Sequence, residues 1–389
     1  DTAALTECEK DYAGFSDEIR RFASGVAALR ADPRLLQAFQ GANRVFGKLA
    51  SGYDSWRLFQ LVYIVTQLPA LAIRENYVQG EFPEGTKREW KDVLDWGDVL
   101  WFRTGGGKTE AYLGLACCAM LYDRLRNKRF GMTAWLRFPL RMLSIQQLQR
   151  AMRVVWETEE ERKRMLGEQA NQSAPFRLGY FVGSTTTPNS LTAEYLSNLT
   201  IEESLERVRV VPDCPACGNR GTVKVQVDVP AVRFRHVCSA CKVELPLDVS
   251  DDEVYRHLPT LVVGTIDKMA TVGQQPKFGL LWGGAKWKCP EHGYGFGDYC
   301  VVYGCKVDKK QRRTLRPYDP VPALHIQDEL HLLQEELGAF SGHYETLIRY
   351  CEEQVGGLPS KVIAATATIE GFENQVRHLY GVKNARRFP

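Results

Sequence analysis

A glycine-rich loop followed by lysine and threonine is the stretch with the clearest chemistry. Residues 98–102 form a short apolar run before the loop, and apolar residues recur at helical spacing after it. A strand, a glycine turn and a helix start place backbone N–H groups around phosphate oxygens. Lys108 would reach the β- and γ-phosphates of a nucleotide, and the Thr109 hydroxyl would bind Mg²⁺. The residues expected to bind ATP here are Thr104, Gly105, Gly106, Gly107, Lys108, Thr109 and Glu110.

The phosphate loop has one departure from the general pattern and one further candidate upstream. Phe102 stands where the pattern begins with glycine, and a glycine turn with an incidental lysine is the alternative. Gln60 follows an aromatic residue at the start of an apolar helix, and its amide is able to pair with adenine. A buried helix start explains Gln60 equally well.

Two acidic residues lie at the end of a second expected strand. Residues 321–327 read as a strand that ends in Asp328 and Glu329, with His331 close behind. At the carboxyl end of a parallel strand, Asp328 would hold Mg²⁺ and Glu329 would polarise the attacking water, so both join Lys108 as catalytic candidates. Residues 361–368 form another strand that closes with the hydroxyls of Thr366 and Thr368, which we expect to couple this loop to a neighbouring surface.

The cysteines are grouped in a way that predicts bound metal. Two C-x-x-C pairs, 20 residues apart, would wrap one tetrahedral Zn²⁺ in a zinc ribbon; four core cysteines are the alternative. A second set has irregular spacing, and an ordinary buried core is its alternative. The first set is Cys214, Cys217, Cys238 and Cys241, and the second is Cys289, His292, Cys300 and Cys305.

Some polar segments suit a phosphate backbone. Arg137 ends a strand and Arg141 begins a helix, and a Gly/Ser/Thr loop follows the next strand. Each candidate has an alternative interpretation that involves no nucleic acid. Arg137 could pair with a carboxylate inside the domain, Arg141 could be a solvated helix residue, and the loop could be a plain turn. The loop candidates are Gly183, Ser184 and Thr185.

The composition is that of an ordinary globular protein. The chain has 389 residues, 44% hydrophobic and 25% charged, with a net charge of +3, so any nucleic-acid site must be a local patch. No 18-residue apolar run and no signal peptide occur. The chain has eleven cysteines, and the grouping of several of them in pairs favours metal in a reducing cytoplasm. The first residue, Asp1, and the last residues predict a fragment of a longer protein.

The elements that position these residues are expected to form an α/β fold, with a parallel sheet and helices on both of its faces. The expected divisions are a helical N-terminal segment at 1–55, the nucleotide domain at 56–190, 256–273 and 320–389, a zinc insertion at 191–255, and a second Cys/His insertion at 274–319.

Taken together, the motifs resemble the first RecA-like domain of superfamily 2 helicases. The loop at 105–109 resembles motif I, residues 137–143 motif Ia, and 264–267 motif Ib, while 328–331 look like a DEAH-type motif II with Leu330 in place of alanine. Residues 366–368 resemble motif III. More narrowly, the segments around 103–114, 138–143 and 327–338 look like the helicase-like subunits of the DISARM anti-phage defence system.

The resemblance implies an ATP-driven DNA helicase or translocase with Mg²⁺, and a partner subunit in a defence complex. It adds Thr265 and Lys268 of motif Ib to the nucleic-acid candidates, and His331 to the coupling residues Thr366 and Thr368. Motifs IV to VI, with the arginine finger of a second RecA-like domain, find no match, so this chain alone is expected to hydrolyse ATP poorly. The competing interpretation is a nucleotide-switched module that binds DNA or a partner without strand separation.

Overall fold

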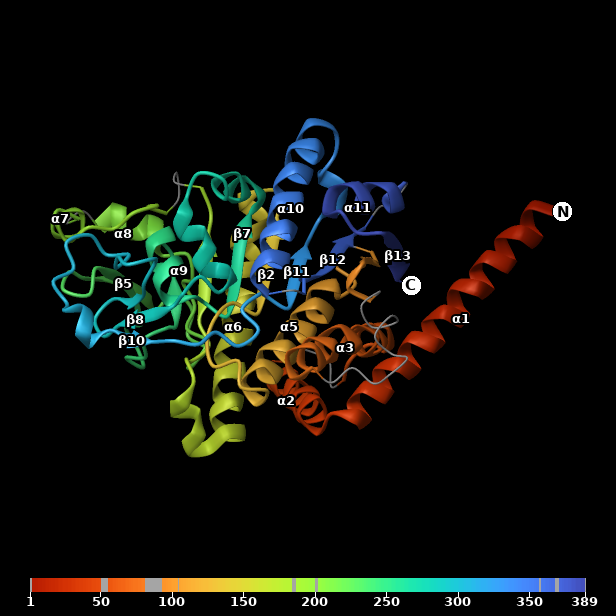
Figure 1. Cartoon of the computed structure of the whole chain (residues 1–389), viewed down its shortest axis with the longest axis horizontal. Coiled ribbons are helices and arrows are strands. Elements are labelled where there is room, and N and C mark those ends of the chain that lie inside the picture. Colours follow the sequence, from red (N-terminus) through yellow and green to blue (C-terminus); the bar gives the residue numbers. More distant parts are fainter. Residues whose placement is uncertain are drawn as a thin grey trace.

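An eight-stranded parallel sheet forms the centre of the computed structural model (Figure 1). The structure describes residues 2–49, 55–80, 93–103, 105–183, 187–199, 202–356, 358–367 and 371–388. The strand order is β13-β1-β12-β11-β2-β7-β3-β6, which confirms the predicted parallel sheet. The strands are β1 (Trp96–Trp101), β2 (Ala134–Phe138), β3 (Leu178–Phe181), β6 (Leu247–Asp248), β7 (Leu261–Thr265), β11 (Leu324–Gln327), β12 (Lys361–Thr366) and β13 (Asn384–Phe388).

Helices cover both faces of this sheet because its strands are apolar on both sides. In β12, Ile363 and Ala365 face one core, while Val362 and Ala364 face the other. The first core includes α3 (Leu58–Gln79), α5 (Lys108–Leu125) and α6 (Arg141–Leu166); the second includes α9 (Asp251–His257), α10 (Glu335–Gly356) and α11 (Phe372–Tyr380). The side-chain period of two in a strand therefore produces the two helical layers.

The N-terminal helices form an additional layer over the first face. α2 (Pro33–Leu49) packs on α5 and α6, and α1 (Thr2–Ala31) packs on α3. A Cβ atom on Gly41 would lie 2.8 Å from Leu121, so glycine permits the close approach of α2 to α5. The first turns of α1 project away from the rest of the molecule (Figure 1). The predicted N-terminal helical segment therefore contributes to the core of the domain.

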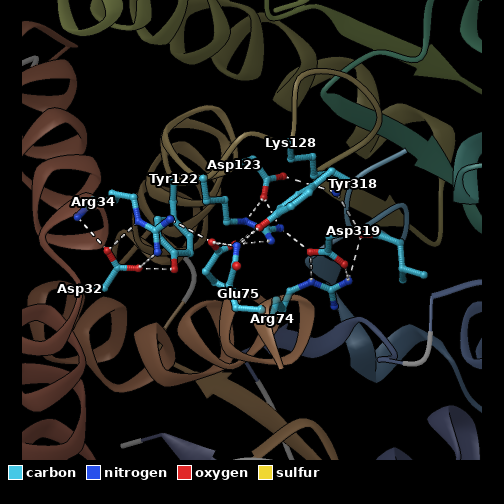
Figure 2. A network of polar contacts seen from close by, with 12 residues as sticks. Asp32, Arg34, Arg74, Glu75, Tyr122, Asp123, Lys128, Tyr318 and Asp319 are labelled. Carbon is cyan, nitrogen blue, oxygen red and sulfur yellow. Dashed lines mark hydrogen bonds and ion pairs between the residues drawn. The ribbon is translucent and has the colours of Figure 1, made fainter. Parts of the chain in front are cut away.

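A buried polar network ties this layer to the amino-terminal edge of the sheet (Figure 2). Asp319 precedes β11 and accepts two hydrogen bonds from Arg74 of α3, at 2.8 and 2.6 Å, and another from Arg126. Asp123 of α5 pairs with Arg126 at 2.6 Å and with Lys128 at 3.4 Å. The opposite charges compensate one another, so the network fastens three separate chain segments without an unpaired buried ion.

The two cysteine-rich insertions form small sheets of their own. β4 (Val223–Asp228) and β5 (Arg233–Cys238) make an antiparallel hairpin, the shape expected of a zinc ribbon. β8 (Trp287–Cys289) pairs with β9 (Gly293–Tyr294) and β10 (Arg313–Thr314). β6 and α9 fall inside the interval expected for the first insertion, yet β6 pairs with β3 of the main sheet. The chain therefore returns to the sheet earlier than its composition indicated.

Candidate nucleotide-binding and metal sites

The glycine loop connects β1 to α5 at the carboxyl edge of the sheet. Gly105 and Gly107 have φ angles of 74° and 97°, a region that favours glycine, and Gly107 is the N-cap of α5. A Cβ atom on Gly106 would lie 2.3 Å from the Phe102 ring. Lys108 begins the helix, and its ammonium group donates a 2.7 Å hydrogen bond to the Phe102 carbonyl. This backbone leaves the helix N-terminus open to an anion. Thr104 lies outside the described residues.

Asp328 and Glu329 follow β11 beside this loop. The Glu329 amide donates a 2.9 Å hydrogen bond to one Asp328 oxygen, and Glu329 itself has a φ of 50°. The other Asp328 oxygen accepts a 2.8 Å hydrogen bond from Tyr112, whose hydroxyl also lies 3.3 Å from that of Thr109. The structure therefore brings together Lys108, Thr109 and both predicted carboxylates, and one buried tyrosine links Thr109 to Asp328.

The charges in this site are incompletely compensated. Burial raises the pKa of Asp328, and the hydrogen bonds from Tyr112 and Glu329 offset only part of that effect. Burial lowers the pKa of Lys108, against the opposing charges of Asp328 and Glu329. Both shifts disfavour the charged form of the side chain. A bound phosphate would favour charged Lys108, and a divalent cation would favour charged Asp328.

A cavity of about 700 Å³ opens over the loop. Its lining combines the phosphate loop and both carboxylates with residues from α2, α3 and α6. From the helices and the residues just before α3 come Asn43, Phe46, Trp56, Arg57, Gln60, Gln147, Arg150 and Arg153. This volume falls in the usual range for a small-molecule site, and polar groups converge at one end of it.

Gln60 is held by the loop itself. Its amide nitrogen donates a 2.9 Å hydrogen bond to the Gly107 carbonyl, and its oxygen accepts from the Arg57 amide at 2.9 Å. Arg57 donates to the Gly106 carbonyl at 2.5 Å, and Phe59 stacks on Phe102 with ring centroids 4.0 Å apart. In this conformation the start of α3 braces the phosphate loop. That geometry favours the helix-start interpretation of Gln60 over adenine pairing.

His331 connects the carboxylate loop to the end of β12. Its Nδ1 atom lies 3.1 Å from the Thr366 hydroxyl and 3.4 Å from a Glu329 oxygen. These contacts suit the expected coupling role of His331 and Thr366. Thr368 lies outside the described residues.

Three of the nucleic-acid candidates are buried, and this corrects the expectation for them. Arg137 is fully buried and pairs with Glu345 at 2.6 Å, which is the internal carboxylate contact considered as its alternative. Lys268 is buried and pairs with Asp251 at 2.6 Å, and Thr265 is buried at the end of β7. In this conformation the side chains of all three are buried inside the domain rather than exposed to a nucleic acid.

Arg141 and Gly183 remain as candidates at the carboxyl edge. A Cβ atom on Gly183 would lie 2.5 Å from the Arg141 guanidinium and 2.7 Å from an Asp267 oxygen, so the three residues converge at one point. Both Arg141 and Gly183 are partly exposed. Ser184 and Thr185 lie outside the described residues.

Both cysteine sets have the spacing of metal ligands. In the first set, the Cys214 and Cys241 sulfurs are 3.7 Å apart and the Cys217 and Cys238 sulfurs 3.8 Å apart. Tetrahedral zinc with Zn–S bonds of about 2.3 Å places two sulfurs about 3.8 Å apart. The four ligand atoms of each set lie within 4.8 Å of one another. The donor set and its geometry therefore fit one Zn²⁺.

The second set fits a zinc ion equally well. The Cys289 sulfur lies 3.9 Å from that of Cys305 and 3.6 Å from Nδ1 of His292. The third sulfur, that of Cys300, completes the group of four. Three thiolates and one imidazole are a recognised structural zinc combination.

Several residues of the site were not predicted from the sequence. Tyr112 lies at the fourth position after Lys108 and reads as an ordinary apolar helix residue, although i+3 spacing places it beside Thr109. Arg57 and Asn43 approach the cavity from helices outside the sheet. The contacts of these residues with the site depend on how the helices pack, so a short apolar pattern in the sequence does not predict them.

Comparison with known proteins adds a relative and several solved structures. No family model matches the chain. The chain is 32% identical over 366 residues to DISARM protein DrmA of Bacillus paralicheniformis, covering 86% of this chain and 30% of that protein. The chain thus spans about a third of the length of this curated relative.

The solved structures are more distant. The DUF1998 helicase MrfA is 12% identical, with a TM-score of 0.44, and covers 90% of this chain and 32% of its own. MrfA bound to DNA and AMPPNP is 13% identical, with a TM-score of 0.42, over 90% of this chain and 29% of its own.

The parallel sheet, the phosphate loop and the strand-end carboxylates together form an α/β domain with a candidate nucleotide-binding site. More particularly, its sequence is similar to that of DrmA, the DISARM protein. No helix in the described part of the chain is both long enough and apolar enough to span a membrane.

Proposed function

We propose that this chain is the first motor domain of an ATP-driven helicase or translocase that acts on DNA in anti-phage defence. One observation carries the proposal: Lys108, Thr109, Asp328 and Glu329 line a single cavity at the carboxyl edge of the sheet. All four residues are present in this chain, whereas a motor that no longer hydrolyses ATP would be expected to have lost at least one of them. The similarity to a DISARM protein supports the defence context and a partner subunit.

The residues divide the work of phosphoryl transfer among them. Backbone N–H groups of the loop and Lys108 hold the phosphates, and Thr109 and Asp328 would hold Mg²⁺, which neutralises phosphate charge when bound. Glu329 orients the attacking water and accepts its proton. His331, between Glu329 and Thr366, passes the state of this site to the end of β12. A second RecA-like domain is expected to complete the site.

The test is ATP hydrolysis by the full-length protein, measured with single-stranded DNA, duplex DNA and RNA. Glu329→Gln is expected to bind ATP normally and to lose turnover by roughly 10²-fold or more, because only the group that activates water changes. Lys108→Ala is expected to abolish ATP binding. Glu336→Gln is the matched control, since this exposed residue of α10 lies outside the cavity and its substitution removes the same charge.

The competing function, a nucleotide-switched binding module, predicts a different result. It requires ATP to change DNA affinity and Glu329→Gln to leave that change intact. Normal hydrolysis by Glu329→Gln would show that the active-site assignment is wrong.

We further propose that each cysteine set holds one structural Zn²⁺, since a closed set of four ligands leaves no open coordination position. Elemental analysis of the purified protein is expected to give two Zn²⁺ per chain. Cys217→Ser and Cys305→Ser should each lower that number by one, while Cys351→Ser, a partly buried cysteine outside both sets, should not change it. A content of zero would exclude both sites.

A further inference from the structure

The second insertion carries an unusual density of positive charge. Residues 306–316 contain six lysines and arginines and one acid, in a chain whose net charge is only +3. Two more lysines belong to or precede β8. We call β8, β9, β10 and residues 295–316 the basic module. Its exposed cations are Lys286, Lys288, Lys306, Lys309, Lys310, Arg313 and Arg316.

These charges are not compensated within the molecule. In the part of the chain that the structure describes, none of the seven exposed cations forms an ion pair with a carboxylate. The zinc-ribbon hairpin differs, because Arg233 and Arg235 of β5 both pair with Glu244, at 2.5 and 2.7 Å. The ribbon neutralises its own arginines, whereas the basic module presents its cations to the outside.

Two of these cations lie directly opposite each other on neighbouring strands. Lys288 of β8 and Arg313 of β10 are direct cross-strand partners in the antiparallel pair. Like charges directly opposite one another destabilise a sheet. The module therefore contains a repulsion that a bound anion would relieve.

Aromatic side chains accompany the charges. Tyr299 is 77% exposed and Tyr303 is 94% exposed, on the loop between β9 and β10. Cys300 and Cys305 flank Tyr303, so the proposed metal set holds this loop in place. Exposed aromatic rings among basic side chains are typical of surfaces that bind single-stranded nucleic acid. The bases stack on the rings, and lysine and arginine bind the phosphates. An acidic peptide would use the cations but not the rings.

The module sits at the edge of the sheet opposite the phosphate loop. Tyr294 of β9 stacks on Phe130, just before the start of β2, with ring centroids 5.1 Å apart. Gly293 packs against the Arg256 carbonyl near the end of α9, so closely that a Cβ atom would lie 2.2 Å from it. Arg141 and Gly183 follow the carboxyl ends of strands. The two surfaces are therefore separate.

We propose that the basic module is a second nucleic-acid contact, which binds a single strand through its phosphates and by base stacking on Tyr299 and Tyr303. The proposal rests on the proposed function for the presence of a nucleic-acid partner. It places an anchor at the amino-terminal edge of the motor, apart from Arg141 and Gly183, the candidates that remain at the carboxyl edge. Contacts to phosphates and ring faces carry little base information, so binding is largely independent of sequence.

The experiment measures binding of fluorescent oligothymidylate to the full-length protein without nucleotide over a series of salt concentrations. Replacing Lys306, Lys309 and Lys310 together by Ala is expected to weaken binding at least tenfold and to lower the salt slope by about two, from roughly 0.7 per lost phosphate contact. Tyr303→Ala is expected to weaken binding several-fold with the salt slope unchanged. The matched control replaces Arg30, Lys163 and Arg164 by Ala, which removes the same charge from exposed positions on α1 and α6.

Lys288→Gln separates binding from a purely structural role. Because it relieves the repulsion with Arg313, it is expected to leave the melting temperature unchanged or raise it while weakening oligothymidylate binding. A lowered melting temperature together with unchanged binding would mean that Lys288 serves the fold alone.

The failures of the two proposals are distinguishable. Unaltered binding by the triple variant, or equal competition by polyglutamate, would overturn the basic module as a nucleic-acid surface while leaving ATP hydrolysis intact. Loss of hydrolysis in the wild-type protein with every nucleic acid would overturn the motor, and oligothymidylate binding that depends on the module would still stand.

Discussion

The two edges of the central sheet both hold buried aspartates beside buried cations, and they use them differently. At the amino-terminal edge, Asp319 accepts hydrogen bonds from Arg74 and Arg126 (Figure 2). At the carboxyl edge, the Asp328 carboxylate accepts hydrogen bonds only from the Tyr112 hydroxyl and the Glu329 backbone amide, among the residues that the structure describes. Both edges hold a buried aspartate, but only at the amino-terminal edge do hydrogen-bonded arginines neutralise its charge.

The pKa shifts record this difference. Burial alone would raise the pKa of Asp319, yet the guanidinium groups of Arg74 and Arg126 lower it well below its ordinary value. At Asp328 burial prevails and the pKa is raised. A compensated carboxylate stabilises the fold, whereas an uncompensated one costs stability until a ligand supplies the missing charge. Incomplete charge compensation, rather than burial of charge, therefore distinguishes the candidate site.

The largest effect is expected from removing the charge at the complete edge. Asp319→Asn should destabilise the protein by about 3–5 kcal/mol, because Arg74 and Arg126 lose their shared partner while remaining buried. Asp328→Asn is the matched substitution at the other edge and should leave the free energy of unfolding unchanged or slightly higher. Chemical denaturation of both variants without nucleotide measures the difference. Equal losses for the two variants would refute the distinction between the edges.

A smaller effect is expected in the pH dependence of stability, with opposite signs at the two edges. The raised pKa of Asp328 means that the folded protein holds a proton which the unfolded chain releases above about 3.9, so stability falls as pH rises through the folded pKa. The lowered pKa of Asp319 contributes stability above that value and loses it as pH falls through the folded pKa.

Denaturation curves from pH 3 to pH 8 check these signs. The gain from Asp328→Asn over the wild type should grow as pH rises above about 4, while the loss from Asp319→Asn should shrink towards pH 3. Mg²⁺ with ATP should stabilise the wild type more than Asp328→Asn, since only the wild type retains the carboxylate proposed to bind the metal. Parallel curves for the two variants would mean that neither carboxyl titrates as its surroundings require.

A second comparison separates the two cysteine-rich insertions. Both present four ligands at zinc spacing, but the ribbon pairs its arginines with Glu244 and the basic module leaves its cations exposed. A shared metal geometry therefore does not imply a shared surface. The ligands shape each insertion, and the exposed side chains decide what it contacts.

The sequence by itself determined the parts of this protein that depend on neighbours along the chain. The glycine turn before Lys108, the strand-end carboxylates and the paired C-x-x-C motifs are local patterns, and each was located from spacing alone. The parallel sheet also followed from short apolar runs alternating with helices. Local geometry is sufficient here because backbone turns and ligand spacing involve few residues.

The tertiary structure alone decided which polar residues are buried and with what partner. Arg137 and Lys268 occupy motif positions, yet each pairs with a carboxylate from a distant segment, Glu345 or Asp251. Tyr112 joins Thr109 to Asp328 only because β11 lies beside α5 in space. Asp319 and Asp328 lie only nine residues apart, and they differ because β11 between them carries them to opposite edges of the sheet. Burial and charge compensation arise from contacts between remote segments, and no local pattern encodes them.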